Sequence, residues 1–217
     1  MNSVTKINYR NPSRWYILFL FAQIAGISQF LLLSFAPLIG FLQNEYQVSE
    51  LTASLHLLVF PLFYVIFSIH SGSMVDNRGY KYTIGFGSLF MVVGACLRIY
   101  TDNFWVPLAG SFAIAIGQPY ILNSITKLVS DWFGKDESAL ATGIGTCGLF
   151  LGMGLGMAIT PLLVETIGFQ QTMLILAGVT ITGTIGFMVI ARVNGTSSES
   201  AFETTSTKAM KILFQKI

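Results

Sequence analysis

The chain has few charged side chains. Only 10% of its 217 residues are Asp, Glu, Lys or Arg, whereas 53% are hydrophobic, and the mean hydropathy is +0.67. A soluble globular domain carries about 25% charged residues, so this chain cannot cover a water-exposed surface with so few charges. Lipid must therefore be much of its solvent. The net charge of +2 is also too small to indicate a nucleic-acid partner.

Residues that hold metals or cofactors are equally scarce. The two cysteines, Cys96 and Cys147, lie in apolar runs without the spacing of a metal or redox site. We expect both to be buried free thiols, and we expect no metal ion and no cofactor. The isolated histidine His56 lies within an apolar run, and we interpret it as a hydrogen-bonded structural residue.

Long apolar runs account for most of the chain. A membrane helix needs about 20 mostly apolar residues, and six segments qualify: 15–41, 51–70, 82–100, 105–129, 139–164 and 170–192. Ser49 and Ser138 are expected to cap the second and the fifth helix. The predicted fold class is an all-α membrane protein, with a cytoplasmic N-terminal segment 1–14, a six-helix bundle over 15–192 and a cytoplasmic linker over 193–217 that includes a short basic amphipathic segment.

Basic residues orient this predicted bundle. Arg98 lies on one side of the membrane, and the other eleven Lys and Arg residues lie on the opposite side: Lys6, Arg10, Arg14, Arg78, Lys81, Lys127, Lys135, Arg192, Lys208, Lys211 and Lys216. Loops rich in Lys and Arg remain in the cytoplasm. Both termini are therefore expected to be cytoplasmic, and the loops near 42–50, 101–104 and 165–169 are expected to face outward.

Two glutamines fall near the centre of the bilayer. Gln29 and Gln118 follow the starts of their helices by fourteen and thirteen residues, or roughly 20 Å at 1.5 Å per residue. Equivalent amides on the first helix of each three-helix half are what a 3+3 inverted repeat produces. The predicted cavity wall comprises Gln29, Phe30, Gln118, Tyr120 and Asn123, with a bend at Pro119. The alternative is that these amides join helices by hydrogen bonds.

Glycines are concentrated in the fifth predicted helix. Gly148, Gly152 and Gly156 recur every four residues, a spacing that permits two helix backbones to approach closely. We therefore predict that this row is a helix-packing surface.

The segment between the second and third predicted helices has a recognisable pattern. Gly72, Asp76, Gly79 and Lys81 match the signature loop of the major facilitator superfamily, although Asn77 and Tyr80 replace basic residues. The segment 72–81 resembles that loop, and the resemblance implies a carrier that works by alternating access. It also implies a conformational latch formed by Asp76, Arg78 and Lys81, with Gly72 and Gly79 allowing a tight turn. The alternative is a simple anchor of positive charge.

A narrower resemblance covers about residues 14–165. The residues that carry it are 76–79, Phe104-Trp105, Gln118 with Ile121-Leu122, and 131–134 with Glu137. They are similar to the feline leukaemia virus subgroup C receptor family, whose members are linked to choline, ethanolamine and haem. The cation site of that family uses a tryptophan and a glutamine. Gln118 matches the glutamine, but Phe30 stands in the tryptophan's place and is a weaker cation–π partner.

The length of the chain raises the question of a partner. Carriers of the superfamily normally have twelve helices, so this chain resembles the N-terminal half, and its second half is the missing C-terminal part, another chain or itself. The expected partners are a small-molecule substrate, the lipid bilayer and that second half. No Asp or Glu lies deep in a predicted span, so a coupling ion is handled elsewhere or transport is passive.

Two rival functions stay open at this point. One is a membrane receptor or scaffold that does not transport, in which the polar face packs dry. The other is an integral membrane enzyme, which we do not expect because the spans hold no Ser/Lys dyad, no paired Asp and no cluster of His.

Overall fold

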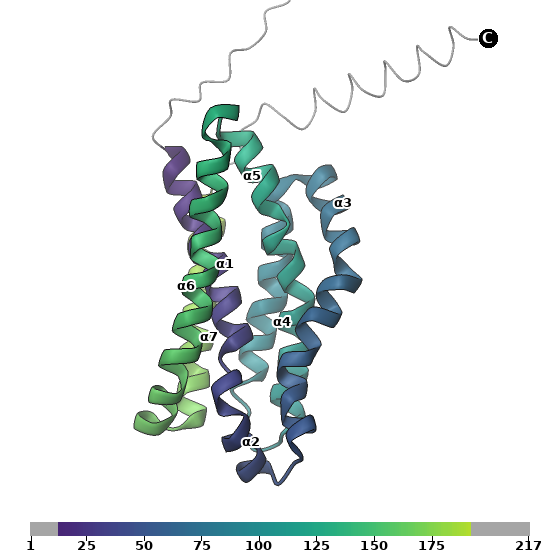
Figure 1. Cartoon of the computed structure of the whole chain (residues 1–217), viewed down its shortest axis with the longest axis vertical. Coiled ribbons are helices and arrows are strands. Elements are labelled where there is room, and N and C mark those ends of the chain that lie inside the picture. Colours follow the sequence, from purple (N-terminus) through teal and green to yellow (C-terminus); the bar gives the residue numbers. More distant parts are fainter. Residues whose placement is uncertain (1–12, 192–217) are drawn as a thin grey trace, which may run out of the picture.

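The computed structural model describes residues 13–191, and all regular secondary structure in this range is helical. The predicted segments 1–14 and 193–217 therefore lie almost entirely outside the described residues. The helices run side by side along one long axis (Figure 1). In chain order they are α1 (Ser13–Leu33), the 3-10 helix η1 (Ala36–Leu38), α2 (Ile39–Tyr46), α3 (Glu50–Leu97), α4 (Trp105–Leu122), α5 (Ser124–Trp132), α6 (Lys135–Ile167) and α7 (Phe169–Ile190).

Five helical stretches of the described chain are long and apolar enough to cross a membrane. They are Ser13–Tyr46, Glu50–Leu97, Trp105–Trp132, Lys135–Ile167 and Phe169–Ile190. The second stretch, α3, contains 48 residues and includes two of the six predicted spans. Its helical backbone is interrupted at Gly79, where φ is 78° and ψ is 166°, and the blue ribbon of α3 turns back at the end of the bundle near its label (Figure 1).

The predicted loop over 72–81 is wrong in extent. The helix continues through Arg78, and only Gly79 leaves the helical conformation. A helix satisfies its own backbone hydrogen bonds, so it can continue past the end of the apolar run, and the Asn77 side chain supports it by donating to Ser73 Oγ at 3.2 Å. The prediction that Gly72 is needed for the turn is also wrong, because Gly72 is helical with open space beside it.

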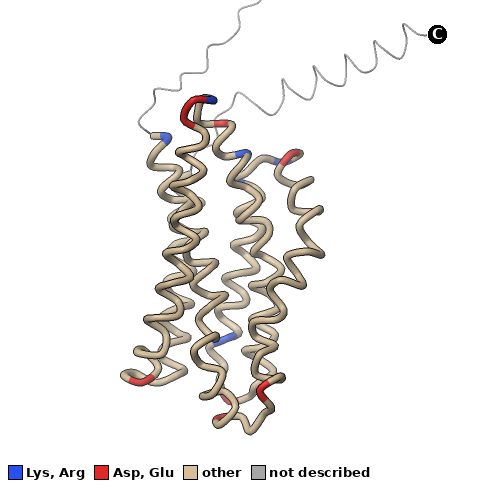
Figure 2. Tube along the Cα trace, in the orientation of Figure 1, with Lys and Arg blue, Asp and Glu red and all other residues tan. Residues whose placement is uncertain are grey.

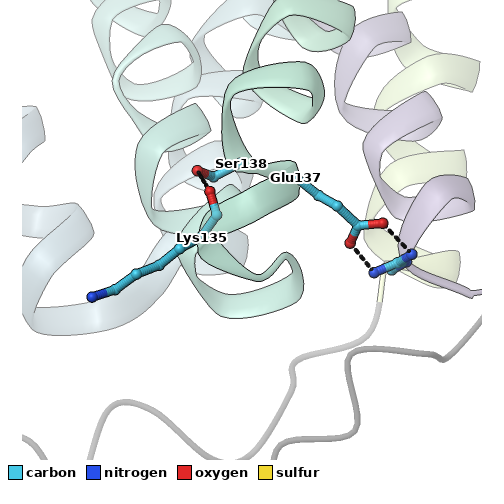
Figure 3. Close-up of polar contacts among 4 residues, drawn as sticks. Lys135, Glu137 and Ser138 are labelled. Atoms are coloured by element: carbon cyan, nitrogen blue, oxygen red, sulfur yellow. Dashed lines mark hydrogen bonds and ion pairs between the residues drawn. The ribbon is translucent and has the colours of Figure 1, made fainter.

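The two predicted helix caps have different outcomes. Ser49 is the N-cap of α3, as predicted, and its Oγ accepts from the Thr52 N–H at 3.2 Å. Ser138 is not a cap, because α6 begins three residues earlier, after Gly134. The Ser138 hydroxyl instead donates to the Lys135 carbonyl at 3.0 Å, within the first turn (Figure 3). The fifth predicted helix, which is α6 in the structure, is therefore longer than its apolar run.

The described surface between the two ends of the bundle is strongly apolar. Ile69 is 85% exposed and Val189 is 76% exposed, as expected for side chains that contact lipid. Both cysteines are free thiols, but the prediction that both are buried is wrong, because Cys147 is exposed and Cys96 is only half-buried. In a membrane protein an apolar run does not distinguish a lipid-facing position from a core position.

Close helix contacts are made through glycines. On α6, Gly148 lies against Ala22 of α1 and Gly152 lies against Gly26 of α1. A Cβ added at Gly156 would meet the Phe30 carbonyl oxygen at 2.7 Å, so this row also faces α1 throughout. No side chain fits between these two backbones, and packing of this kind drives helix association in lipid.

A second glycine interface joins α3 to α4, and the sequence analysis missed it. Gly87 lies against Gly117, and Gly94 lies against Gly110, in each case with a backbone carbonyl where a Cβ would be. The signal was present as two glycines seven residues apart in each helix. The most extensive helix contacts are made by the same pairs of helices that the glycines join. Helix α1 packs mainly against α6 and α7, and α4 packs mainly against α3.

Most charged residues gather at the two ends of the described bundle (Figure 2). At one end the Arg14 guanidinium, at the start of α1, donates to both carboxylate oxygens of Glu137 on α6, at 2.5 and 2.9 Å. Figure 3 shows these two bonds to Glu137. Lys127 pairs with Asp131 one helical turn away at 3.2 Å. The first contact ties the start of α1 to the start of α6, whereas the second lies within α5.

Candidate functional site

A pocket of about 380 Å³ brings the two predicted glutamines together. Gln29 reaches it from α1 and Gln118 from α4, while α3 contributes most of the remaining wall. The lining residues are Gln29, Leu32, Leu57, Phe60, Pro61, Tyr64, Val65 and Gln118. The wall thus combines two carboxamides and one phenol with apolar and aromatic surface, and none of its side chains is charged.

The two glutamines are almost completely buried, at 2% exposure for Gln29 and 3% for Gln118. Within the described residues, Oε1 of Gln29 has no hydrogen-bond partner. A buried acceptor without a partner costs roughly 1–3 kcal/mol. A hydroxyl or ammonium donor that reached this oxygen would offset that cost, so Gln29 Oε1 is a candidate acceptor for a bound molecule.

Asn123 lies behind this wall. Its Oδ1 accepts from the Tyr64 hydroxyl at 2.9 Å, and its Nδ2 donates to Ser71 Oγ at 2.7 Å. Asn123 occupies the single residue between α4 and α5, four residues after Pro119. It therefore joins α4 to α3, and it affects the pocket by orienting the Tyr64 phenol.

Tyr120 is also directed away from the pocket. Its ring is 2% exposed and lies edge-on to Phe86, with ring centroids 4.9 Å apart. Its hydroxyl is hydrogen-bonded to His70 Nδ1 at 2.7 Å. Tyr120 therefore connects α4 to the first part of α3 and does not line the space beside Gln29 and Gln118.

Phe30 lines a different hollow, although it follows Gln29 directly in the sequence. This second hollow, of about 540 Å³, lies among α1, α6 and α7, and Gln23 also borders it. At 100° per residue, Gln23 and Gln29 lie about 120° apart around α1. Of the five residues predicted for one cavity wall, the structure brings Gln29 and Gln118 to one pocket and places Phe30, Tyr120 and Asn123 elsewhere.

The residues of the signature segment lie at an exposed end of the bundle. Asp76 and Arg78 are exposed, and Lys81 is half-buried. Arg78 donates to the Tyr82 hydroxyl at 2.6 Å and lies over that ring. Asp76 forms no ion pair with any residue that the structure describes. Its carboxylate is therefore accessible to a partner outside the described segment.

The sequence analysis missed a buried cluster near the opposite end of the bundle. Arg98 was counted only as the one basic residue on the outer side of the membrane, and its burial was not predicted: its side chain is 1% exposed. His56 is hydrogen-bonded, as predicted: its Nδ1 lies 2.7 Å from Ser111 Oγ, and Arg98 donates to the same oxygen at 2.8 Å. The available signal was a single Arg at the end of an otherwise apolar run.

The pocket is suited to reversible binding rather than to catalysis. Its polar groups are amides and a phenol, which donate and accept hydrogen bonds without forming a nucleophile and base pair. Across residues 13–191, no three His, Cys, Asp or Glu side chains come together in an arrangement that could hold a metal ion. The chemistry of the wall matches a small molecule with hydrogen-bonding groups and some apolar surface.

Residues 17–216 match the family model described as the Major Facilitator Superfamily. Among curated proteins, the chain is 27% identical over 155 residues to an uncharacterized MFS-type transporter of Caenorhabditis elegans, covering 70% of this chain and 26% of that protein. It is 26% identical over 170 residues to the choline/ethanolamine transporter FLVCR1 of Mus musculus, covering 77% and 30%. The chain thus spans about a quarter to a third of the length of these relatives.

The fold also resembles solved structures. One is the crystal structure of the peptide transporter POT in complex with sulfate, with a TM-score of 0.70 and 14% identity. The match covers 94% of this chain and 46% of that chain. At this identity the likeness concerns the arrangement of helices alone.

Proposed function

The chain belongs to the Major Facilitator Superfamily, and we propose that it forms the N-terminal six-helix bundle of a carrier for a small organic solute. The solute is moved by alternating access between this bundle and a second one. The observation that carries the proposal is the pocket shared by Gln29 and Gln118, in which a buried amide oxygen lacks a partner among the described residues.

Six membrane crossings follow if α3 counts as two. A straight helix of 48 residues is about 72 Å long, whereas the hydrocarbon core is about 30 Å thick. The break at Gly79 divides α3 into 50–78 and 80–97, each of which is long enough for one crossing. The bundle over 15–192 then has two groups of three helices: α1 with the two parts of α3, and α4–α5 with α6 and α7.

The pairing of these helices supports a 3+3 inverted repeat. In the first group, α1 packs mainly against α6 and α7, the second and third helices of the other group. In the second group, α4 packs mainly against α3, which supplies the second and third helices of the first group. A two-fold axis in the membrane plane relates the two groups of an inverted repeat, so each contact of the first helix of one group has a counterpart made by the first helix of the other group. Gln29 and Gln118 then occupy corresponding helices, which accounts for their meeting at one pocket.

The charges support an orientation with the Gly79 turn in the cytoplasm. Arg14 lies at the start of α1, Arg78 and Lys81 lie beside the Gly79 turn, and Lys127 and Lys135 lie on α5 and at the start of α6, all at one end of the described bundle. That end also carries acidic residues, whereas Glu45, Glu50, Asp102 and Glu165 lie by the connections at the other end. By the positive-inside rule the first end is cytoplasmic. We assign the chain to the cell membrane, with both termini in the cytoplasm.

The signature segment is proposed to be a latch at the cytoplasmic seam. Asp76 is exposed and forms no ion pair with the described residues, whereas Arg78 is held near the turn by Tyr82. Together with Lys81, they present both signs of charge to a second bundle. The match to 46% of the POT structure supports such a partner, supplied by further sequence, another chain or a second copy.

The solute is proposed to be small, with at least one hydrogen-bond donor. FLVCR1 of Mus musculus is a choline/ethanolamine transporter, so these two molecules are the first probes. The lining residues offer no carboxylate for a cation, but Phe60 and Tyr64 offer aromatic surface. With no carboxylate in the pocket, we propose passive transport or an ion site in the second bundle.

Binding to the full chain in lipid nanodiscs tests the pocket. Radiolabelled choline and ethanolamine are added to the parent chain and to Gln29→Ala, Gln118→Ala and Gln23→Ala. A lost hydrogen bond of about 0.5–1.5 kcal/mol predicts a rise in Kd of roughly two- to tenfold for the first two variants. Gln23→Ala is the matched control, since it removes the same amide from the other hollow on α1. Equal Kd values in all four proteins, or no binding to the parent, would contradict the proposal.

A further inference from the structure

The buried charge that the proposed function leaves unexplained is Arg98. It follows the last residue of α3, and its guanidinium donates to the Leu31 carbonyl at 2.8 Å, to Ser34 Oγ at 3.3 Å and to Ser111 Oγ at 2.8 Å. All three acceptors are neutral, and no carboxylate of the described residues forms an ion pair with Arg98. Burying a guanidinium in this way costs several kcal/mol, so its surroundings must offset that cost.

Two features of the surroundings favour the charge. Leu31 is among the last residues of α1, whose final carbonyls have no partner within the helix and carry partial negative charge. The Phe35 ring lies under the guanidinium, with its centroid 4.5 Å from Cζ, and also stacks on His56 at 4.2 Å. The cation is thus placed at the end of α1 by the helix dipole and by an aromatic face.

Two of the three acceptors of Arg98 belong to the helices that carry the pocket glutamines. Leu31 is two residues from Gln29 on α1. Ser111 precedes Gln118 by seven residues on α4, which is two turns along nearly the same face. A single planar group therefore joins the end of α1 to α4 within two helical turns of each pocket glutamine, and His56 adds the first part of α3 through Ser111.

We propose that Arg98 is a positioning residue that holds the end of α1 against α4 and thereby sets the separation of the Gln29 and Gln118 amides. The contacts of Arg98 support its effect on the spacing of α1 and α4, whereas its effect on solute binding rests on the proposed solute pocket. Arg is suited to the role, because its rigid fork reaches two acceptors on different helices at once, whereas a lysine ammonium is a single point charge on a flexible stem.

Replacement by an apolar residue separates positioning from stability. Arg98 is buried without a counter-ion among the described residues, so an apolar side chain of similar volume removes the desolvation cost of the charge together with its three hydrogen bonds. Arg98→Met should therefore keep or raise the Tm while it loosens the spacing of α1 and α4. Arg98→Lys should preserve that spacing in part. A residue with a purely structural role would instead lower the Tm in Arg98→Met and leave the spacing unchanged.

Spin labels measure the spacing without any solute. Leu33→Cys at the end of α1 and Ala109→Cys on α4 carry the labels, in the full chain with Cys96→Ser and Cys147→Ser, reconstituted in nanodiscs. Arg98→Met is expected to broaden the distance distribution. Ser111→Ala should do so to a smaller extent, and Ser130→Ala should have no effect, since its hydroxyl bonds only within its own helix. An unchanged distribution in Arg98→Met would overturn the proposal.

Binding of choline and ethanolamine is measured on the same variants without labels. Loss of one hydrogen bond raises Kd about two- to tenfold, so misplacement of both amides should raise Kd about four- to a hundredfold in Arg98→Met, with partial rescue in Arg98→Lys. If the parent binds neither probe, the solute proposal fails and the spin-label distances alone decide the role of Arg98. If Gln29→Ala weakens binding but Arg98→Met leaves Kd unchanged, the pocket stands and the positioning role is refuted.

Discussion

Substitution of Gly152 by alanine probes the closest contact between α1 and α6. An added Cβ would lie 2.7 Å from Gly26 Cα and from Gly26 C, and still nearer to Gly26 O. Carbon atoms pack at about 3.5–4.0 Å, so the two backbones must separate by roughly 1 Å. Neither helix offers a flexible side chain at this point that could move aside instead.

The cost follows from this overlap. Overpacking by one methyl group typically destabilises by about 1–3 kcal/mol, and for a chain of this length 1 kcal/mol lowers the Tm by about 2–4 °C. We therefore expect Gly152→Ala to lower the Tm by about 2–12 °C. The separation also shifts the face of α1 that carries Gln29, so Kd for the probes should rise together with the loss of stability.

Gly154 provides a matched control on the same helix. It is exposed, and a Cβ added there meets no atom within 4 Å. Gly154→Ala gains the same helix propensity of about 0.8–1 kcal/mol as Gly152→Ala, so the difference between the two variants reports the contact alone. Thermal unfolding followed by circular dichroism in one detergent gives both Tm values. Equal Tm values would refute the packing of α6 against α1 described above.

Three further predictions concern the end of the bundle that carries the Gly79 turn. Gly79→Ala places a Cβ on a residue with φ 78° and ψ 166° and should lower the free energy of unfolding by about 1–3 kcal/mol. The control Gly72→Ala, at a helical position with open space beside it, should not lower it. Denaturant titration measures the free energy of unfolding of both variants. Asp76→Asn should bias the carrier inward, and labelling of a cysteine introduced in the pocket checks this, with unchanged accessibility counting against the latch. Glu137→Gln removes a partly exposed ion pair with Arg14 and should lower the free energy of unfolding by less than about 1 kcal/mol. This difference should disappear in high salt. A larger loss that does not depend on salt would show that the pair behaves as a buried ion pair.

The segments that cross the bilayer were predictable because hydrocarbon imposes length and composition. Each predicted span lies largely within an observed helix, and Ser49 caps α3 as expected. The four-residue spacing of the α6 glycines indicated a packing row, and a row does face α1. The helix ends were less accurate: α3 continues through Arg78, and α6 begins at Lys135, because polar helical turns extend beyond the apolar core.

The faces of the helices were not predictable in the same way. In a soluble protein the apolar stripe of a helix marks its buried side, but in lipid both sides are apolar. Phe30 and Gln29 are neighbours in sequence, yet they line different hollows. Asn123 is close in sequence to Gln118, yet the hydroxyls of α3 engage its amide. These outcomes depend on which helix lies opposite each residue. The apolar pattern of a single helix does not carry that information.

By itself, the sequence determined that the chain consists of membrane helices with a family signature between two of its apolar segments, since the bilayer selects for length, apolarity and satisfied backbone. Only the tertiary structure decided that α1 pairs with α6 and α4 with α3, that Gln29 and Gln118 meet, and that Arg98 is buried between their helices. Helix pairing in lipid depends on shape and on a few hydrogen bonds, and these exist only once the helices are side by side.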